Sequence, residues 1–483
     1  MAGRYVVAAL AGISTIIVVR ELTDDQWGEF SVILALLGIV GFIADLRLSR
    51  IVLADVLNAD EAEARRIVGS YTGLRLVIGV VSYAVAMACV GIGAATGDFS
   101  REVVIGTALG GLNLIILSVA FGLILLFEAR LWLRSVATAN VLGQVGSFAL
   151  TVSVTLAGIG TLFWFIGAHV VNGVVVLVFL ALTLRRGTGI RISFERSEWW
   201  VWMREAAPLA LGAALDTIYF RIDIIMLSIM DSARAAGIYN VGYKFSDLIG
   251  AVPLAVVTPA LTWMVASWPE DRAAFRRTFR HALVMLMVAA VGACAGFLVF
   301  AEPLITTLYS DRFRVGADAA RLLVVGQGLH FLTLLAFITL VACKRNRLYP
   351  VAMLLGVVVN IGLNLVLIPK HSFLGSGWAT VITEALVLMT LGAGVMRIPG
   401  LAPLPWGALA KTLLAGGVAG GLGWVLLDRI PWPVGLGAVA VVYLGLVHLL
   451  APNGPGGLRA FAGEPHDDLL SVVEPGRDRP EMG

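Results

Sequence analysis

Long apolar runs recur along this sequence and constrain its fold more than any other feature. Of its 483 residues, 59% are hydrophobic and 14% are charged, whereas an ordinary soluble domain has about 25% charged residues. A run of about 20 apolar residues is enough to cross a bilayer as a helix. We therefore predict an all-α polytopic membrane protein with about 14 transmembrane helices, centred near residues 11, 38, 83, 115, 146, 172, 218, 250, 293, 330, 360, 385, 416 and 441.

The charges between these spans indicate the orientation of the chain. If the N-terminus lies inside, the inner loops hold most of the arginines, among them Arg65, Arg66, Arg276 and Arg277. Because positively charged loops favour the cytoplasmic side, we expect both termini in the cytoplasm.

The first predicted span is short and contains a charge. Residues 2–19 barely cover a bilayer and include Arg4. We expect either that the natural start lies upstream of Met1 or that the Arg4 side chain reaches the cytoplasmic surface.

A weak internal repeat suggests two related lobes. Trp27–Ser31 and Ala236–Asn240 align at an offset of 209, and Arg134 and Gly143 align with Arg347 and Gly356 at an offset of 213. An even number of spans separates the matches, so the lobes are expected to share one orientation, around an axis along the membrane normal and a central cavity. A chance match remains the alternative, because glycine is common in this chain.

The repeat and the composition together predict the domain organisation. We expect an N-lobe of six spans, a cytoplasmic linker, a C-lobe of six spans, two extra helices, and a disordered cytoplasmic tail rich in Gly, Pro, Asp and Glu. The corresponding ranges are 1–183, 184–204, 205–396, 397–450 and 451–483.

The linker combines arginines with three tryptophans, Trp199, Trp200 and Trp202. This pattern fits an amphipathic helix on an anionic leaflet. An ordinary inner loop with an aromatic anchor is the alternative.

Five ionisable residues, Asp216, Arg221, Asp223, Lys244 and Asp247, lie in the seventh and eighth predicted spans. A charge near the bilayer centre costs at least ~2.5 to 3.5 kcal/mol, so such residues often mark a substrate or ion path. These residues are the strongest indication of a functional site.

Counting from the turn between the two spans places Asp223 opposite Lys244 and Arg221 opposite Asp247. Both pairs could form, which would make the cluster a structural network. Arg221 and Asp223 are about 200° apart around a helix, so we expect only one of them to face the neighbouring span. The alternative to the network is that Arg221 or Lys244 lines the cavity.

Several short motifs resemble those of Wzx-type polysaccharide flippases. That family belongs to the superfamily that also contains MATE exporters and lipid II flippases. The resemblance covers about residues 1 to 450 and is carried by Arg20–Leu22, Trp27–Phe30, Arg221–Asp223, Ala236–Asn240, Lys244–Phe245, and Leu374–Thr380 leading to Glu384.

The resemblance implies a two-lobe transporter in the cytoplasmic (inner) membrane of a bacterium. It would move polyprenyl-pyrophosphate-linked oligosaccharide to the outer leaflet by alternating access, for polysaccharide biosynthesis. Arg221 and Lys244 would correspond to the family's cationic cavity residues. The implied partners are the lipid-linked glycan and membrane lipids, with a glycan polymerase and glycosyltransferases as further expectations and no nucleic acid.

Two carboxylates are candidates for coupling transport to an ion gradient. Glu384 would supply a second-lobe carboxylate for proton or sodium coupling, and Asp216 is the other candidate. A hydrogen-bonded structural role is the alternative for Glu384.

The sequence predicts no enzyme, cofactor or metal site. It contains no phosphate-binding Gly-Lys-Ser loop and no HExxH motif, and Cys89, Cys294 and Cys343 show no CxxC spacing. A MATE-type ion-coupled small-molecule exporter remains the alternative, since it would need an acidic or aromatic cavity rather than a cationic one. A membrane enzyme acting on lipid-linked sugars ranks third, because we would expect it to carry a large outer loop.

Overall fold

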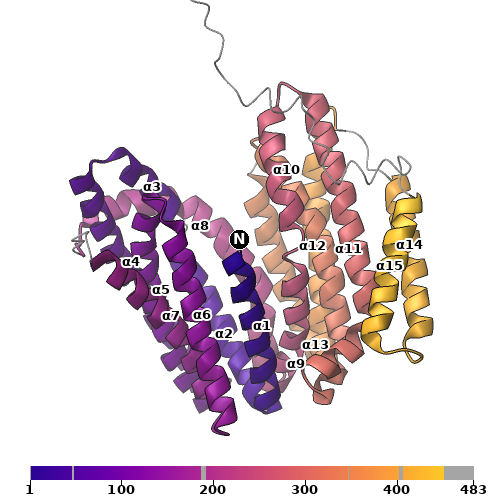
Figure 1. The fold of residues 1–483 in the computed structure, drawn as a ribbon, viewed down its shortest axis with the longest axis horizontal. Coiled ribbons are helices and arrows are strands. Elements are labelled where there is room, and N and C mark those ends of the chain that lie inside the picture. The colour runs from indigo at the N-terminus through magenta and orange to yellow at the C-terminus, as the bar shows by residue number, and fades with distance from the viewer. Residues whose placement is uncertain (1, 46–47, 186–191, 346, 402–405, 451–483) are drawn as a thin grey trace, which may run out of the picture. The chain divides into compact units, whose positions relative to one another are not determined.

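The computed structural model describes residues 2–45, 48–185, 192–345, 347–401 and 406–450. Within these ranges the chain forms helices and no strands (Figure 1). The elements are α1 (Ala2–Glu21), α2 (Asp24–Asp45), α3 (Ser49–Asn58), α4 (Glu61–Thr96), α5 (Arg101–Ala129), α6 (Leu133–Leu156), α7 (Leu162–Arg185), α8 (Arg196–Met230), α9 (Ala233–Ile249), α10 (Leu254–Ser267), α11 (Arg272–Leu308), the 3-10 helix η1 (Asp311–Gly316), α12 (Ala317–Ala342), α13 (Leu348–Met396), α14 (Trp406–Leu426) and α15 (Trp432–Leu450).

The chain is a multi-pass membrane protein. In the described ranges, 10 helices are long and apolar enough to cross a membrane, or up to 11 if α9 and α10 form one broken span. All predicted span centres lie in helices except residue 250, which falls in the break between α9 and α10. The predicted all-α polytopic fold is confirmed.

The longest helix, α13, contains two predicted spans and is broken between them. Ser372 has non-helical backbone angles (φ 51°, ψ −136°). A Cβ on Gly356 would lie 2.9 Å from Val387 Cγ2, and Gly394 likewise meets Leu348. These contacts pair the early part of α13 with its late part, so its two halves run antiparallel.

Contacts divide the chain into two compact units. Unit 1 comprises Met1–Val252 and Ala301–Pro399, and unit 2 comprises Pro253–Phe300 and Gly400–Gly483. Within unit 1 we distinguish the first helix group, α1 to α7, from the second helix group, α8, α9, α12 and α13. The predicted tail, 451–483, lies outside the described residues.

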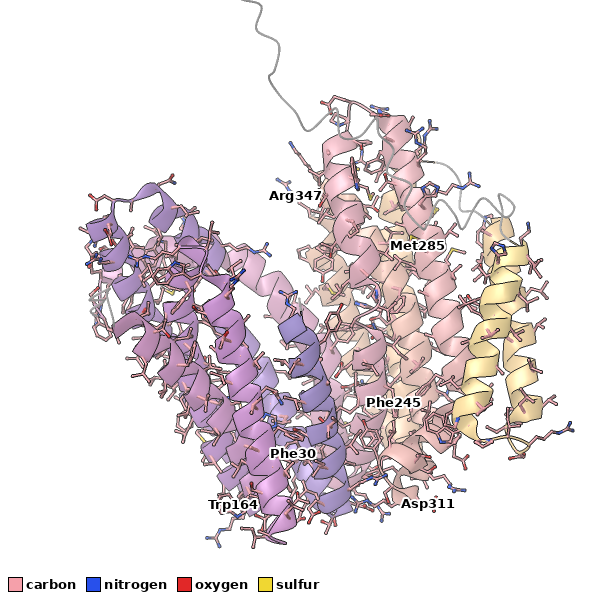
Figure 2. All side chains as sticks on the ribbon, viewed as in Figure 1. Phe30, Trp164, Phe245, Met285, Asp311 and Arg347 are labelled. Atoms are coloured by element: carbon pink, nitrogen blue, oxygen red, sulfur yellow. The ribbon has the colours of Figure 1, made fainter. Side chains whose placement is uncertain are left out.

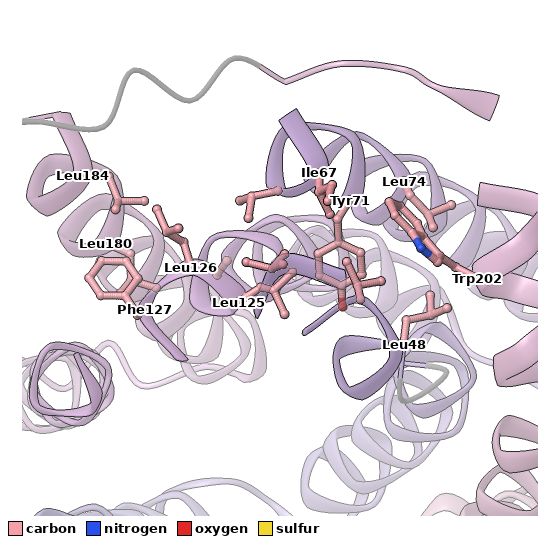
Figure 3. Packing of buried hydrophobic residues seen from close by; sticks show 14 of the residues in the cluster. Leu48, Ile67, Tyr71, Leu74, Leu125, Leu126, Phe127, Leu180, Leu184 and Trp202 are labelled. Carbon is pink, nitrogen blue, oxygen red and sulfur yellow. The ribbon is translucent and has the colours of Figure 1, made fainter. Parts of the chain in front are cut away.

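The first helix group has an apolar core near the start of α4. Tyr71, Leu125 and Phe127 are fully or almost fully buried there, with Leu180 of α7 (Figure 3). The Asp60 side chain caps α4 by accepting a hydrogen bond from the Glu63 backbone N–H (2.8 Å). The cap satisfies one of the backbone donors that a helix start leaves free.

Two of the three linker tryptophans belong to this core. The Trp199 and Trp202 side chains are buried, and their indole N–H groups donate to the Ser70 carbonyl (3.1 Å) and to Asp55 (2.8 Å). Only Trp200 is largely exposed. The described part of the linker therefore docks on the first helix group, and α8 begins within it.

Labelled residues mark the two opposite ends of unit 1. In Figure 2, Trp164 and Asp311 lie at one end and Arg347 lies at the opposite end. The turn between α1 and α2 meets η1 beside Asp311, because Arg312 donates to the Leu22 carbonyl (2.6 Å). We call this the turn end of unit 1.

Unit 2 packs α11 against α14 and α15 through glycines. Tyr443 of α15 donates a hydrogen bond to the Val288 carbonyl (2.7 Å), and its ring lies against Gly292. A Cβ on Gly296 would lie 3.0 Å from Leu436 of α15. Small residues at this spacing permit close helix approach in membranes.

Candidate functional site

The charged residues predicted from the sequence lie on α8 and α9, which a short turn joins. Ser232 caps α9 by accepting a hydrogen bond from the Ala235 backbone N–H (3.1 Å). The turn makes the two helices antiparallel neighbours, so residues equally distant from it face each other.

Arg221 of α8 pairs with Asp247 of α9, as the depth count predicts. Arg221 Nη2 donates to Asp247 Oδ2 across 3.1 Å, and the two side chains are 31% and 48% exposed. The guanidinium also lies 5.5 Å from the centroid of the Tyr243 ring. Both side chains are partly exposed, so another anion can reach the guanidinium.

Asp223 is fully buried and bound by three donors. The hydroxyls of Tyr239 and Tyr243 donate to its Oδ2 at 2.9 and 2.6 Å, and the Ile224 backbone N–H donates to its Oδ1 at 2.9 Å. The Tyr239 hydroxyl also lies 3.1 Å from Thr380 Oγ1 of α13. Burying a carboxylate is unfavourable unless donors surround it, and these donors fulfil that role.

The contacts of these two helices differ from the count along the sequence at two points. Asp223 does not pair with Lys244, because the two tyrosine hydroxyls occupy its carboxylate. Arg221 and Asp223 both contact α9, although only one of them was expected to do so. Tyr243 explains this: the Arg221 guanidinium lies over its ring while its hydroxyl reaches Asp223.

Lys244 faces the first helix group. Its Nζ lies 6.0 Å from the centroid of the Trp27 ring in α2, and it interacts electrostatically with His169 of α7. The side chain is half-buried, and no carboxylate among the described side chains lies within 4.0 Å of it. A cation–π contact offsets about 0.5 to 2 kcal/mol of desolvation. Lys244 therefore forms no ion pair within 4.0 Å among the described side chains, and its electrostatic attraction to Asp247 on the same helix acts over a longer distance.

Asp216 lies on α8. Its side chain is outside the described part of the structure, so its predicted place in the cavity and in coupling stays a prediction.

Glu384 lies in the second half of α13 and is almost fully buried. Its Oε1 is 3.3 Å from His330 Nδ1 of α12, and its Oε2 accepts a hydrogen bond from Thr333 at 3.4 Å. The edge of the His330 ring meets Phe220 of α8, with ring centroids 5.0 Å apart. The proximity of His330 and Glu384 was not predicted from the sequence.

Arg75 in α4 is a second residue that the sequence analysis missed. Its side chain is buried, its Nε donates to the Tyr71 hydroxyl (2.8 Å), and its guanidinium lies 5.2 and 5.7 Å from the rings of Tyr71 and Phe121. An arginine inside an apolar run is the signal that singled out Arg221, and it would have found Arg75 too.

The two helix groups meet at the turn end along a contact that we call the seam, formed by residues 24–31 of α2 and 233–240 of α9. Trp27 Nε1 donates to the Gly237 carbonyl (2.9 Å), and Asn240 Nδ2 donates to Ser31 Oγ (2.7 Å). Figure 2 labels Phe30, which lies on the α2 side of this contact. The seam joins the two helix groups.

A charge cluster extends the seam toward η1. The Asp24 carboxylate lies 3.0 Å from Arg234 Nη2 and 3.2 Å from Arg312 Nε. Arg234 lies in α9 and Arg312 lies in η1, so a single carboxylate of α2 binds two other segments of the chain.

Metal-binding clusters are absent from the described ranges, where no group of three His, Cys, Asp or Glu residues is placed to hold an ion.

Comparison with known proteins shows a family and a fold. The model of the family described as "Polysaccharide biosynthesis protein" matches residues 17–317. No curated protein matches the chain.

Solved transporters share the fold at low sequence identity. The lipid II flippase MurJ in an inward closed conformation has a TM-score of 0.75 at 13% identity, covering 96% of this chain and 99% of its own. An inward-facing multidrug resistance MATE family transporter has a TM-score of 0.70 at 16% identity, covering 81% of this chain and 94% of its own. A MOP superfamily transporter from Pyrococcus furiosus has a TM-score of 0.57 at 17% identity, covering 83% of this chain and 93% of its own.

Proposed function

This chain belongs to the polysaccharide biosynthesis protein family, and from that premise we propose that it flips polyprenyl-pyrophosphate-linked oligosaccharide across the cytoplasmic membrane of a bacterium. A protein of the same fold carries the name lipid II flippase. The substrate class combines an anionic pyrophosphate with a polar glycan and an apolar lipid tail. A flippase for this substrate needs a cation that binds the pyrophosphate inside a polar path across the membrane. The apolar tail can stay in the lipid beside that path.

Lys244 is the observation that carries this proposal. Its half-buried ammonium faces Trp27 of the other helix group, and the described side chains offer it no carboxylate within 4.0 Å. A pyrophosphate would supply the missing negative charge and would accept charge-assisted hydrogen bonds from the ammonium. Binding would thereby offset the cost of keeping Lys244 charged.

Arg221 supplies a second cation for the same group. Its partner Asp247 is 48% exposed, so a competing anion can reach the pair. A phosphate can replace the carboxylate at the guanidinium, since a planar guanidinium binds two phosphate oxygens at once. Asp247 then acts as a stand-in that keeps Arg221 neutralised between transport cycles.

Alternating access would use the seam as one gate. We assign the turn end to the outer side, because the arginine-rich loops prefer the cytoplasm; both termini then lie in the cytoplasm. With the seam closed, the outer ends of the two helix groups are joined. Opening it would release the glycan on the outer side, where a polymerase and related enzymes would receive it.

The test replaces each cation in cells whose surface polysaccharide depends on this chain. We expect Lys244→Ala to abolish surface polymer, and Arg221→Ala to reduce it at least about tenfold, which is the loss of about 1.4 kcal/mol of binding. Membrane levels of each variant are measured by immunoblot.

Two exposed cations serve as controls, Lys370→Ala for the lysine and Arg347→Ala for the arginine. Both should leave the polymer unchanged. Normal polymer from both Lys244→Ala and Arg221→Ala would rule out the cationic site.

A MATE-type exporter of small molecules is the second candidate. The likeness of fold to MATE transporters favours it, and the exposed Asp247 could bind a cation. Exporter activity predicts that loss of the chain increases sensitivity to cationic drugs while surface polymer stays normal. The flippase predicts the opposite pair of results.

A further inference from the structure

His330 and Glu384 bring an imidazole and a carboxylate together inside the second helix group. Their closest atoms, His330 Nδ1 and Glu384 Oε1, are 3.3 Å apart. The imidazole comes from α12 and the carboxylate from the second half of α13, so the contact spans two helices. Neither residue belongs to the Lys244 and Arg221 site.

The burial of Glu384 determines how many protons the pair holds. Its side chain is 2% exposed, and the Thr333 hydroxyl approaches it only to 3.4 Å. A buried carboxylate with so little solvation is costly unless it gains a proton or a cationic partner. A proton on the Glu384 carboxyl group removes the buried charge and so satisfies the pair.

His330 is the more exposed member of the pair. Its side chain is 20% exposed, ten times more than that of Glu384. The imidazole is therefore the better placed of the two groups to exchange a proton, and the carboxyl group is the enclosed one. Histidine suits this role because its ordinary titration range includes physiological pH.

Other ionisable groups connect the pair to the substrate cations. Phe220, whose ring meets His330, precedes Arg221 in α8 and so ties the imidazole to the Arg221–Asp247 pair. On α13, Thr380 lies one turn before Glu384 and contacts Tyr239, which donates to Asp223. A change of charge at the pair can thus reach α8 and α9 through direct contacts.

We propose that His330 and Glu384 form a proton-binding pair, and that this pair makes the proton the coupling ion of the flippase. The proposal rests on the proposed function for its second half only. The pair takes one proton from one side of the membrane and releases the same proton on the other side. No bond other than that to the proton changes.

Infrared difference spectroscopy tests proton binding on the purified full-length chain in lipid. We expect a carboxylic C=O stretching band that disappears as pH rises, and we expect E384Q to lack it. In H330Q the frequency of that band should change, because the carboxyl group loses its imidazole neighbour. An unchanged band in E384Q, or an unchanged band frequency in H330Q, would overturn the pair.

Matched controls exclude general effects of the substitutions. E270Q and H281Q change exposed residues outside the second helix group, and both should leave the band and its frequency unaltered. If E384Q does not fold, H330Q still tests the pair, because His330 is the more exposed partner and its replacement disturbs the packing less. Size-exclusion profiles establish that each variant is folded.

Proton flux in proteoliposomes tests coupling, with undecaprenyl pyrophosphate as the probe. An imposed pH gradient should decay at least about tenfold faster with the probe than without it, and H330Q and E384Q should abolish this acceleration. Probe-dependent proton flux equal to wild type in both variants would overturn coupling. If the wild type does not transport the probe, the proposed function fails, and the infrared bands still decide the proton-binding pair.

Discussion

Asn240 donates a hydrogen bond to Ser31 across 2.7 Å, and the two residues are 209 positions apart, the same offset as the internal repeat. Gly28 and Gly237 have this offset too, and a Cβ on Gly237 would lie 2.9 Å from the Gly28 backbone nitrogen. When equivalent residues of two related halves touch each other, the symmetry axis passes through their contact. The repeat stays a prediction, and it would place the axis between its two lobes at the seam.

The close approach at the seam predicts the effect of a single methyl group. Gly237→Ala should destabilise the protein by about 1 to 3 kcal/mol, because its Cβ would press against the Gly28 backbone, which cannot rotate away. Gly38→Ala on α2 is the control, since a Cβ there meets nothing within 4 Å. Thermal unfolding in detergent measures both. Equal melting temperatures for the two variants would contradict the packing of the seam.

A disulfide across the seam should lock it. In a background with Cys89, Cys294 and Cys343 replaced by alanine, S31C/N240C brings two thiols together where the Asn240 and Ser31 side chains now touch. We expect oxidation to stop export of surface polysaccharide and a reductant to restore it. Either single cysteine variant should be insensitive to oxidation. Full transport by the oxidised double variant would show that the seam is not a gate.

The sequence predicts much of this fold because hydrophobic length determines which segments span a membrane. It predicts the Arg221–Asp247 pair because two antiparallel helices joined by a short turn align residues by depth. It does not predict that Asp223 binds Tyr239 and Tyr243. In a sequence, a tyrosine that donates its hydroxyl to a carboxylate cannot be distinguished from any other tyrosine. The rotation of each helix about its axis determines which tyrosines face the carboxylate.

The contact between His330 and Glu384 could not be predicted from the sequence either. His330 and Glu384 are 54 positions apart, and their meeting depends on how α12 packs against the second half of α13. Arg75, by contrast, could have been predicted, since its position inside an apolar run can be read from the sequence.

Tyr239 and Tyr243 should both contribute to stabilising the buried Asp223 carboxylate. Tyr239→Phe and Tyr243→Phe each remove one donor from a buried carboxylate and should cost about 1 to 3 kcal/mol of unfolding free energy. The double variant should cost more than the sum, since only the Ile224 backbone N–H then remains among the donors described. Tyr83→Phe on α4 serves as the control. Urea or thermal unfolding of the four variants measures this, and a strictly additive double variant would argue against a shared carboxylate.

Arg75 should not be replaceable by lysine. Its guanidinium lies over Tyr71 and near Phe121 while its Nε donates to the Tyr71 hydroxyl. A compact, strongly hydrated ammonium loses the planar stacking, so Arg75→Lys should lower the melting temperature. Arg134→Lys, at the start of α6, is the matched control and should leave the melting temperature unchanged. A melting temperature of Arg75→Lys equal to wild type would mean that the stacking contributes nothing to stability.

Asp24 should hold the seam closed through its two arginines. Asp24→Asn removes both ion pairs, to Arg234 and to Arg312. Because these side chains are partly exposed, each pair contributes only about 0.2 to 1 kcal/mol. In the S31C/N240C background we therefore expect Asp24→Asn to slow disulfide formation severalfold, since the seam is open for more of the time. High salt screens the wild-type pairs, so the two oxidation rates should converge as salt increases. A difference that persists at high salt would assign the effect to the Asp24 side chain's packing and not to its charge.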